Sequence, residues 1–334
     1  MQRLPFEQVQ ATLAGVLVKL GMEPERARTC ARLFAETTRD GVYTHGINRF
    51  PRLVKTIGNG CVDVKAKAGR VAGVGALERW DGRKGPGNLN ALEAMERAIE
   101  LARLHGIGCV AMGNTNHWMR GGTYGWQAAD AGMAAICWTN TMPNVPPWGG
   151  LEAMIGNNPL VFAAPRRGGH VVLDMAMSQY SYGALESYRK KGELLPVEGG
   201  FDEEGKLTRD PGAIERSQRP LPIGYWKGSG LSVMLDMIAA MLSLGRATHQ
   251  VPADSLKEAG VSQMFIAMNP EAFGPEPRAA EIADAVVASL HGCKPETEGR
   301  TVRYPGEQTL RVRAENEKLG LPVEEATWAE ILAM

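Results

Sequence analysis

A histidine and an arginine stand four residues apart in the segment 37–52, which reads Thr-Thr-Arg-Asp-Gly-Val-Tyr-Thr-His-Gly-Ile-Asn-Arg-Phe-Pro-Arg. His45 is of the side-chain type that best passes a proton near neutral pH, and Arg49 can bind a carboxylate through two parallel hydrogen bonds. On a helical turn, residues four apart share one face. We therefore expect His45 to meet the carbonyl oxygen of a 2-oxo acid while Arg49 holds its carboxylate. The alternative is a surface helix start that carries both residues without a function.

A second histidine, His117, lies in the polar run 114–125, Asn-Thr-Asn-His-Trp-Met-Arg-Gly-Gly-Thr-Tyr-Gly. The run falls between the end of a predicted strand and the start of a predicted helix, and such connections often carry the residues of a site. Arg120 adds a positive charge. The run is equally well explained by packing alone, so both interpretations stay open.

A third stretch, 222–232, reads Pro-Ile-Gly-Tyr-Trp-Lys-Gly-Ser-Gly-Leu-Ser and opens a predicted apolar helix. Free backbone N–H groups at a helix N-terminus attract phosphate, and Lys227 adds a positive charge. Trp226 could stack on a flat ring. An ordinary helix start would explain the same residues, and the late run Tyr304-Pro-Gly-Glu-Gln308 also reads, by itself, as a capped helix start.

The other reactive residue types are not arranged for catalysis. The six histidines are scattered, with no acidic pair spaced for metal binding, so we expect no metal site. No G-x-S-x-G nucleophile motif occurs in the chain. Cys109 and Cys137 lie in apolar predicted strands, which is typical of unreactive core thiols. Acid–base chemistry at a carbonyl or an alcohol remains.

The composition limits the partners of the chain. Its 334 residues are 44% hydrophobic and 22% charged, and 37 Lys plus Arg balance 37 Asp plus Glu. We therefore expect no nucleic-acid partner and no anionic membrane partner. The five cysteines include no C-x-x-C pair and the N-terminus has no signal-type apolar segment, which together predict a reduced, cytoplasmic protein. The longest apolar stretch, 231–244, contains Asp236 and is expected to be a buried helix.

These residues must be positioned by a chain that alternates helices with strands. The apolar spacing predicts helices over 6–20, 24–38, 50–60, 88–105, 121–131, 177–192, 229–245, 277–291, 307–319 and 328–332. It predicts strands over 70–80, 107–112, 133–139, 159–164, 170–175 and 261–268. The order indicates an α+β fold, or an α/β fold with an unusual sheet. The connection 193–224 is long enough to be expected to have a function.

A loosened dinucleotide fingerprint, G-x-G-x-x-A, occurs at 106–111. The fingerprint requires a strand before it and a helix after it, whereas here a helix precedes and a strand follows. We therefore expect that any NAD is bound in a non-Rossmann manner.

Six longer runs resemble the type 2 malate/L-lactate dehydrogenase family, which is unrelated in fold to the Rossmann enzymes of the same names. The resemblance extends from Phe6 to Trp328, and its runs occupy 41–51, 116–122, 124–129, 136–140, 146–149 and 224–230. It implies an α+β fold with a largely antiparallel central sheet. It also implies a helical substrate and dimer domain, 1–68 with 306–334, beside a non-Rossmann NAD-binding domain, 69–305.

The resemblance implies an NAD(P)H-dependent reductase that acts as a homodimer. The expected reaction reduces a 2-oxo sugar acid, in the first place 2,3-diketo-L-gulonate to 3-dehydro-L-gulonate. His45 would donate the proton to the substrate carbonyl. His117 matches a second histidine that some relatives use as the acid–base residue, so the choice of donor stays open. The substrate-binding residues implied are Arg49, Thr44, Asn48, Trp118 and Arg120.

The same resemblance implies three cofactor segments. Their residues are His170, Val171, Val172, Leu173, Asp174, Met175, Ala176, Trp226, Lys227, Gly306, Glu307 and Gln308. Asp174 could bind a ribose hydroxyl, which favours NADH, with NADPH as the alternative. Two departures from the family pattern stand out. Thr44 replaces the expected serine and keeps the hydroxyl, and the loop 166–169 is one residue longer beside the cofactor segment.

Other substrates fit the same resemblance. A simpler acid such as malate, lactate or ureidoglycolate, or a cyclic imino acid, would use the same histidine and arginine. An alternative of a different class is a non-catalytic sugar-acid binding protein. Because His45, His117, Arg49 and Lys227 are all present, we favour an enzyme.

Overall fold

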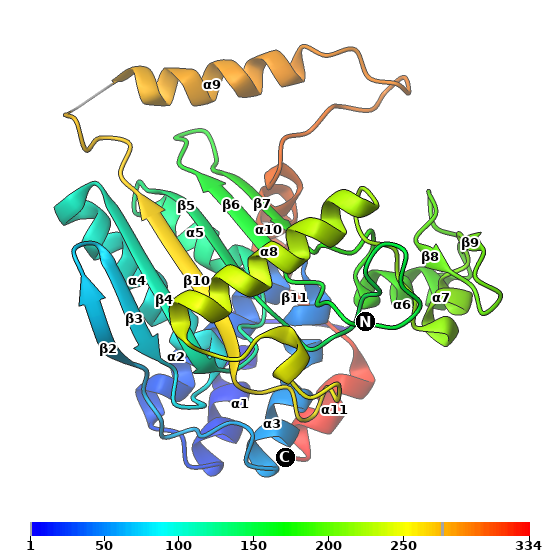
Figure 1. The fold of residues 1–334 in the computed structure, drawn as a ribbon, viewed down its shortest axis with the longest axis horizontal. Coiled ribbons are helices and arrows are strands. Elements are labelled where there is room, and N and C mark those ends of the chain that lie inside the picture. The colour runs from blue at the N-terminus through cyan, green and yellow to red at the C-terminus, as the bar shows by residue number, and fades with distance from the viewer. Residues whose placement is uncertain (1, 275–276) are drawn as a thin grey trace.

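A seven-stranded sheet runs through the middle of the protein (Figure 1). The computed structural model describes residues 2–274 and 277–334. The strands, in their order across the sheet, are β2 (Gly69–Val74), β3 (Leu77–Asp81), β4 (Ile107–Thr115), β10 (Val261–Met268), β5 (Ala134–Thr139), β6 (Leu160–Ala164) and β7 (Val171–Met175). Strands β3 and β4 run parallel, and the other neighbouring pairs run antiparallel. The predicted mixture of helices and strands is confirmed.

Helices cover both faces of this sheet (Figure 1). Helices α4 (Gly87–His105) and α5 (Gly122–Asp130) lie on one face, where their apolar side chains pack with Phe265 and Val172 of the strands. Helix α8 (Trp226–Ser243) lies on the other face, and its Leu235 carbonyl accepts a hydrogen bond from Trp138 Nε1. Strand β10 is buried along most of its length, which explains the apolar run 264–268 in its sequence.

A second hydrophobic core is built mainly by helices from the two ends of the chain. Its elements are α1 (Phe6–Lys19), α2 (Pro24–Arg39), α3 (Phe50–Gly58) and α11 (Glu325–Leu332), together with the paired strands β1 (Gln2–Leu4) and β11 (Leu321–Val323). Helix α10 (Glu307–Leu319) leads into this core. Leu13, Phe50 and Ile331 are each fully buried there. The first and last segments of the chain therefore fold together.

A small lobe adjoins the β7 side of the sheet (Figure 1). It contains α6 (Tyr182–Lys191), α7 (Pro211–Ser217) and the hairpin of β8 (Gly200–Phe201) with β9 (Leu207–Thr208). Leu185, Leu195 and Ile214 form its own small core. Helix α9 (Pro277–His291) lies beside the ends of the strands and is tied to them by an ion pair of 2.6 Å between Asp284 and Arg166.

Two predicted elements are wrong in detail. The single strand expected over 70–80 is the hairpin of β2 and β3, because Gly75 adopts a φ of +54° and reverses the chain. The apolar helix expected to be buried is α8, and several of its large apolar side chains are exposed, among them Met237 at 49% and Met241 at 66%. Helix α8 presents to solvent the face that does not contact the sheet. No helix among the described residues is long and apolar enough to cross a membrane.

Candidate active site

The turn that carries His45 is shaped by the end of α2. Helix α2 stops at Asp40, and Gly41 takes a left-handed φ of +84°. Two short 3-10 helices follow, η1 (Tyr43–His45) and η2 (Ile47–Arg49), and Gly46 separates them. The single helical turn expected over residues 45–49 is therefore wrong.

Gly46 is required where it stands. A Cβ at this position would lie 2.1 Å from Thr38 Oγ1 and 2.9 Å from the Thr38 backbone nitrogen. That close approach lets the Ile47 N–H donate to Thr38 Oγ1 at 2.9 Å. The last turn of α2 thus fixes the position of His45.

The two candidate histidines, far apart in sequence, lie against each other. The rings of His45 and His117 are stacked, with their centroids 5.9 Å apart and their planes 23° apart. The Met119 N–H donates to His117 Nδ1 at 3.0 Å, and Met119 takes an unusual φ of +66° to direct it there. Since Nδ1 accepts a hydrogen bond, neutral His117 holds its proton on Nε2. Thr44 Oγ1 lies 2.9 Å from His45 Nδ1 and orients that ring.

Both histidines are neutral in the free protein. Burial, together with the positive charges of Arg49, Arg120 and Arg52, lowers the pKa of His45 to about 4. Burial and the charge of Arg49 also lower the pKa of His117 well below its usual value. The site therefore carries an excess of positive charge, which a bound anion would offset.

A cleft with about 350 Å³ of free space, part of it open to solvent, lies beside the histidine pair. The residues that line it are Arg49, Arg52, Leu53, Thr56, Val62, Gly87, Asn116, His117, Met119, Ser255 and Glu258. They come from η2, α3 and the segment after it, from the start of α4, from the loop after β4 and from the loop before β10. The cleft thus lies between the helical core and the sheet.

The two arginines of the cleft differ in what holds them. Arg52 donates from Nε and Nη2 to the Ser255 carbonyl at 2.9 and 2.6 Å. The Arg49 guanidinium forms no hydrogen bond or ion pair with any residue in the described part of the chain, and only the Arg49 backbone N–H is bonded, to the Gly46 carbonyl at 2.9 Å. Burial and the nearby Arg52 lower the pKa of Arg49 to about 10, so it stays charged at neutral pH. Arg49 is therefore free to bind an anion.

Two residues expected to bind substrate are held in the interior instead. Trp118 is 1% exposed and packs against Tyr124 and Phe265 in the core of the sheet. Arg120 is 5% exposed and its Nη1 donates to Asp40 Oδ2 at 2.6 Å. Neither side chain is among those that line the cleft, because both point back from the loop into the protein.

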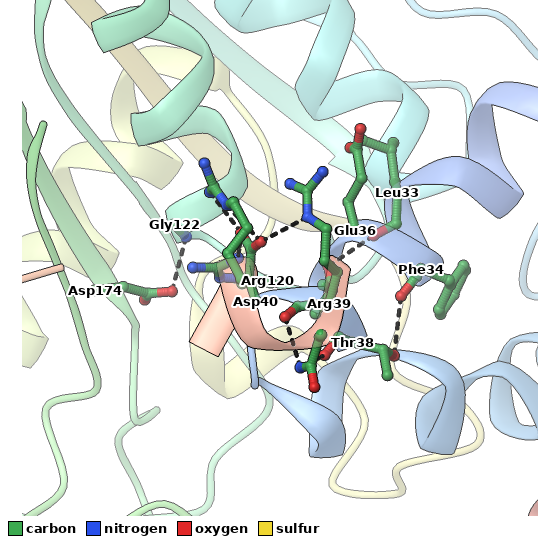
Figure 2. Close-up of polar contacts among 12 residues, drawn as sticks. Leu33, Phe34, Glu36, Thr38, Arg39, Asp40, Arg120, Gly122 and Asp174 are labelled. Atoms are coloured by element: carbon green, nitrogen blue, oxygen red, sulfur yellow. Dashed lines mark hydrogen bonds and ion pairs between the residues drawn. The ribbon is translucent and has the colours of Figure 1, made fainter. Parts of the chain in front are cut away.

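Asp40 is the centre of a network that Figure 2 shows in close-up. Its carboxylate accepts hydrogen bonds from Arg120, from Arg39 at 3.0 Å and from both Nε and Nη2 of Arg313 at 2.8 Å. Burial alone would raise the pKa of Asp40, but the three arginines hold it below its usual range. The network joins α2, the loop after His117 and α10.

The remaining substrate candidates, Thr44 and Asn48, lie near the turn but outside the cleft lining. Thr44 is exposed, and Gly183 at the start of α6 packs directly on it. Asn48 Nδ2 donates to Glu324 Oε1 at 2.9 Å, which joins the turn to the C-terminal segment. Both residues therefore lie where the helical core meets neighbouring parts of the chain.

Two of the three predicted cofactor segments meet at the edge strand β7. The Val172 N–H donates to the Pro305 carbonyl at 2.9 Å, and a Cβ at Gly306 would lie 3.1 Å from the Val172 nitrogen. Beyond the other end of β7, Ser178 pairs with Pro222, shortly before Trp226 and Lys227 begin α8. The structure thus brings 170–176 and 306–308 together, and it connects 226–227 with the segment after β7 through the Ser178–Pro222 pair.

Individual side chains of these segments have different surroundings. Asp174 Oδ2 accepts the Gly122 N–H at 2.7 Å at the start of α5, and burial of this carboxyl raises its pKa although the residue as a whole is exposed. Trp226 is 64% exposed, with Lys227 Nζ 6.0 Å from its ring centroid. The segments therefore offer an acidic group, a flat ring and a positive charge, which are groups that suit a nicotinamide dinucleotide.

The other cofactor candidates make contacts within the protein. His170 Nδ1 accepts the Arg166 N–H at 3.0 Å, and its Nε2 lies 3.0 Å from Asp130 Oδ1. The remaining side-chain contacts are those of Glu307 with Tyr304 N and His291, and of Gln308 with Arg303. Within 2–274 and 277–334 no group of three or more His, Cys, Asp or Glu residues could hold a metal ion.

Sequence reasoning missed several residues of the site. Arg52 stands inside the quoted segment but was assigned no role, although it follows Arg49 by three residues, close to one helical turn. Ser255 and Glu258 lie about 200 positions later, in a loop without apolar period, so no local signal could have linked them to Arg49. Asp40 also stands in the quoted segment without an assigned role.

Comparison with known proteins agrees with this geometry. The chain matches the model of the malate/L-lactate dehydrogenase family over residues 4–332. It is 46% identical over 332 residues to 2,3-diketo-L-gulonate reductase from Escherichia coli, which covers 99% of this chain and 100% of that protein.

Solved structures show the same fold. Sulfolactate dehydrogenase from Methanocaldococcus jannaschii is 29% identical, with a TM-score of 0.91 over 99% of this chain and 95% of that one. Delta1-piperideine-2-carboxylate reductase from Pseudomonas syringae pv. tomato is 28% identical, with a TM-score of 0.89 over 100% and 99% of the two chains. The resemblance read from the sequence is confirmed: the chain belongs to the malate/L-lactate dehydrogenase family and is an oxidoreductase of the dehydrogenase and reductase type.

Proposed function

We propose that this protein reduces a 2-oxo sugar acid with NADH, and that its substrate is 2,3-diketo-L-gulonate, which it converts to 3-dehydro-L-gulonate. The relative with 46% identity over the full length has this substrate in its name. The observation that carries the proposal is the unpaired Arg49, which lines the same cleft as His117, whose ring stacks on His45. A fixed positive charge beside neutral imidazoles suits an acid whose carbonyl is adjacent to its carboxylate.

Arg49 would hold the substrate carboxylate through two parallel hydrogen bonds. The added negative charge offsets the arginines that lower the pKa of His45, so the pKa of His45 rises when substrate binds. His45 then takes up a proton and donates it to the carbonyl oxygen as that oxygen becomes an alkoxide. We assign the donation to His45 and propose that the fixed Nε2–H of His117 binds the same oxygen. The half-enclosed cleft strengthens both contacts.

A nicotinamide cofactor, when bound, supplies the hydride for this reduction. The residues that would hold it are those at the free edge of β7, at the start of α8 and at Gly306. Gly306 lies close against β7, since a Cβ there would be 3.1 Å from the Val172 nitrogen, and Trp226 and Lys227 are open to solvent. The negative charge that an ionised Asp174 carries favours a ribose hydroxyl over a phosphate, which supports NADH rather than NADPH. The position of Gly183 against Thr44 connects the segment after β7 with the His45 turn.

We further propose a homodimer in a reducing, cytoplasmic compartment. All five cysteines are unpaired, which agrees with such a compartment. Residues 1–68 and 306–334 would form the substrate and dimer domain, and 69–305 the cofactor domain. Supporting this division, the helical core and the core under α4 form two separate clusters of buried residues.

The test is NADH oxidation, followed by the loss of nicotinamide absorbance, across a panel of 2-oxo acids with NADPH in parallel. We expect 2,3-diketo-L-gulonate to be reduced much faster than pyruvate or oxaloacetate. Activity on the simple acids alone would support the proposed reductase activity but contradict the proposed substrate. If no 2-oxo acid is reduced, cyclic imino acids become the next candidates, and a lack of all turnover would leave a binding protein.

The role of His45 is tested by His45→Ala. Loss of a general acid should lower kcat by about 10²-fold or more, since acid catalysis contributes about 10²- to 10⁴-fold. His117→Ala measured in the same assay separates the two roles. A smaller loss in His45→Ala than in His117→Ala would reassign the proton donor to His117.

A further inference from the structure

Only the nitrogen of the Asn116 side-chain amide is hydrogen-bonded, although Asn116 is buried, with 3% of its surface exposed. Its Nδ2 donates to the carbonyls of Lys84 at 2.8 Å, Gly85 at 2.9 Å and Cys61 at 3.3 Å. Three carbonyls around one atom identify that atom as the nitrogen. Asn116 Oδ1 is therefore the remaining acceptor, and it is buried without a hydrogen-bond partner among the described residues.

The Glu258 carboxylate is a second hydrogen-bond acceptor in the same cleft, and most of its acceptor positions are not used. It is 9% exposed, and within the described part of the chain its carboxylate makes two polar contacts, both of them long. The Met142 N–H donates to Oε1 at 3.4 Å, and Arg52 Nη2 lies 3.9 Å from Oε2. A carboxylate has about four acceptor positions, so most of those of Glu258 remain available to a ligand.

The lining of the cleft is thus divided by hydrogen-bonding type. Arg49 and the Nε2–H of His117 are donors, whereas Asn116 Oδ1 and Glu258 are acceptors. A ligand that satisfies all of them has a carboxylate and a carbonyl at one end and several O–H groups along its chain. An unhydroxylated acid would leave Asn116 Oδ1 buried and unpaired and Glu258 with only its two long contacts, which is unfavourable.

We propose that Asn116 and Glu258 determine specificity by accepting hydrogen bonds from the chain hydroxyls of the substrate. The site would then select hydroxylated 2-oxo acids over unhydroxylated acids of the same length. This inference rests on the proposed reductase activity. It extends that proposal by naming the residues that bind the hydroxylated part of the substrate. Sites built to bind a substrate hydroxyl discriminate strongly against analogues that lack it.

The experiment compares kcat/KM for two six-carbon acids, 2,3-diketo-L-gulonate and 2-oxohexanoate, in the wild type and in Glu258→Gln. Glutamine keeps the shape of the side chain but replaces the charged acceptor by a weaker neutral one. Loss of the negative charge next to Arg52 affects the binding of both anions alike, so it cancels in the ratio of the two values. We expect the ratio of kcat/KM for 2,3-diketo-L-gulonate to kcat/KM for 2-oxohexanoate to fall by about 10-fold or more in Glu258→Gln. This size is in line with the loss of hydrogen bonds to a charged group.

Asp254→Asn is the matched control. Asp254 lies in the same loop, its side chain is 45% exposed, and it does not line the cleft. We expect it to leave the ratio unchanged. Glu258→Asp, which keeps the charge but withdraws the carboxylate, replaces the glutamine variant if that variant melts well below the wild type, and the same fall in the ratio is expected.

A merely structural role for Glu258 would lower kcat/KM for both acids equally and leave the ratio intact, which would overturn the inference. Equal wild-type turnover of the two acids would also overturn it while the reductase activity stands. Absence of turnover with every 2-oxo acid would instead overturn the proposed function.

Discussion

At the scale of single residues, the site depends on how charge is distributed around His45 and His117. Three arginines act on His45, and Glu258 is the only acid among the described residues that line the cleft. Burial is the larger cause that keeps both imidazoles neutral, and the excess of positive charge adds to it until an anion binds. Substrate binding and protonation are therefore coupled, and the free protein is sensitive to acid.

The pH dependence of stability tests this charge distribution. The pKa of His45 is about 4 in the folded protein, against about 6.5 for histidine in an unfolded chain. Between these pH values the unfolded chain binds more protons, so stability is complete above pH 6.5 and decreases as the pH falls toward 4. His45→Ala removes this contribution, and its urea midpoint should fall less than that of the wild type between pH 7 and 5. The exposed His105, changed to Ala, is the control, and identical slopes in all three proteins would contradict the prediction.

The residues of the site were only partly predictable from sequence. His45, Arg49 and His117 were recognisable from residue type and neighbours, and the structure brings them together. Trp118 and Arg120 belong to the same polar run, yet they are buried in the protein, where Trp118 packs in the core and Arg120 pairs with Asp40. The partner of Arg120 is Asp40, 80 positions away, and no local pattern encodes that pairing.

At the scale of elements, periodicity located most helices and strands closely. The predicted spans of β10, α9 and α10 coincide with the observed ones. Failures occurred where the backbone depends on one glycine, at Gly75 in the hairpin and at Gly46 in the His45 turn. Helix α6 begins at Tyr182 rather than at 177. Ser181 caps the helix there, because its Oγ accepts a hydrogen bond from the Ala184 N–H.

The Asp40 network shows how elements are held in register around the site. Asp40→Asn would leave Arg120 and Arg313 buried without a full negative charge, so we expect a loss of about 3–5 kcal/mol in unfolding free energy. Urea unfolding measures it. Glu317→Gln is the control, because Glu317 is 55% exposed and pairs with Arg39 at 3.6 Å, and surface pairs contribute about 0–1 kcal/mol. Similar losses in the two variants would show that Asp40 has no special role.

At the scale of the whole molecule, α8 exposes an apolar stripe formed by Leu231, Met234, Met237 and Met241. Spacings of three and four residues put these side chains on one face of the helix. Exposed contiguous apolar surface commonly marks an interaction site. The proposed homodimer gives this face a partner, and it explains why the apolar sequence of α8 predicted burial.

Met237→Glu tests that contact. A carboxylate in the middle of an apolar interface is costly, so the variant should sediment as a single chain of 36.1 kDa, whereas the wild type should sediment near twice that mass. Leu104→Glu, at a side chain 73% exposed at the end of α4, should remain dimeric. If Met237→Glu sediments like the wild type, the dimer contact lies elsewhere.

The pairing of β1 with β11 has a consequence for how the protein is made. Trp328 and Ile331 are synthesised long after Leu13 and Phe50, yet all four share one core. Arg313, which holds Asp40 behind the His45 turn, is also synthesised much later than its partner. On the ribosome, α1, α2 and α3 therefore cannot complete this core until α10 and α11 have emerged. Domains usually fold N-terminal first during synthesis. Here a chain that stops before α10 lacks both the packing of α11 and the Arg313 contact behind the His45 turn.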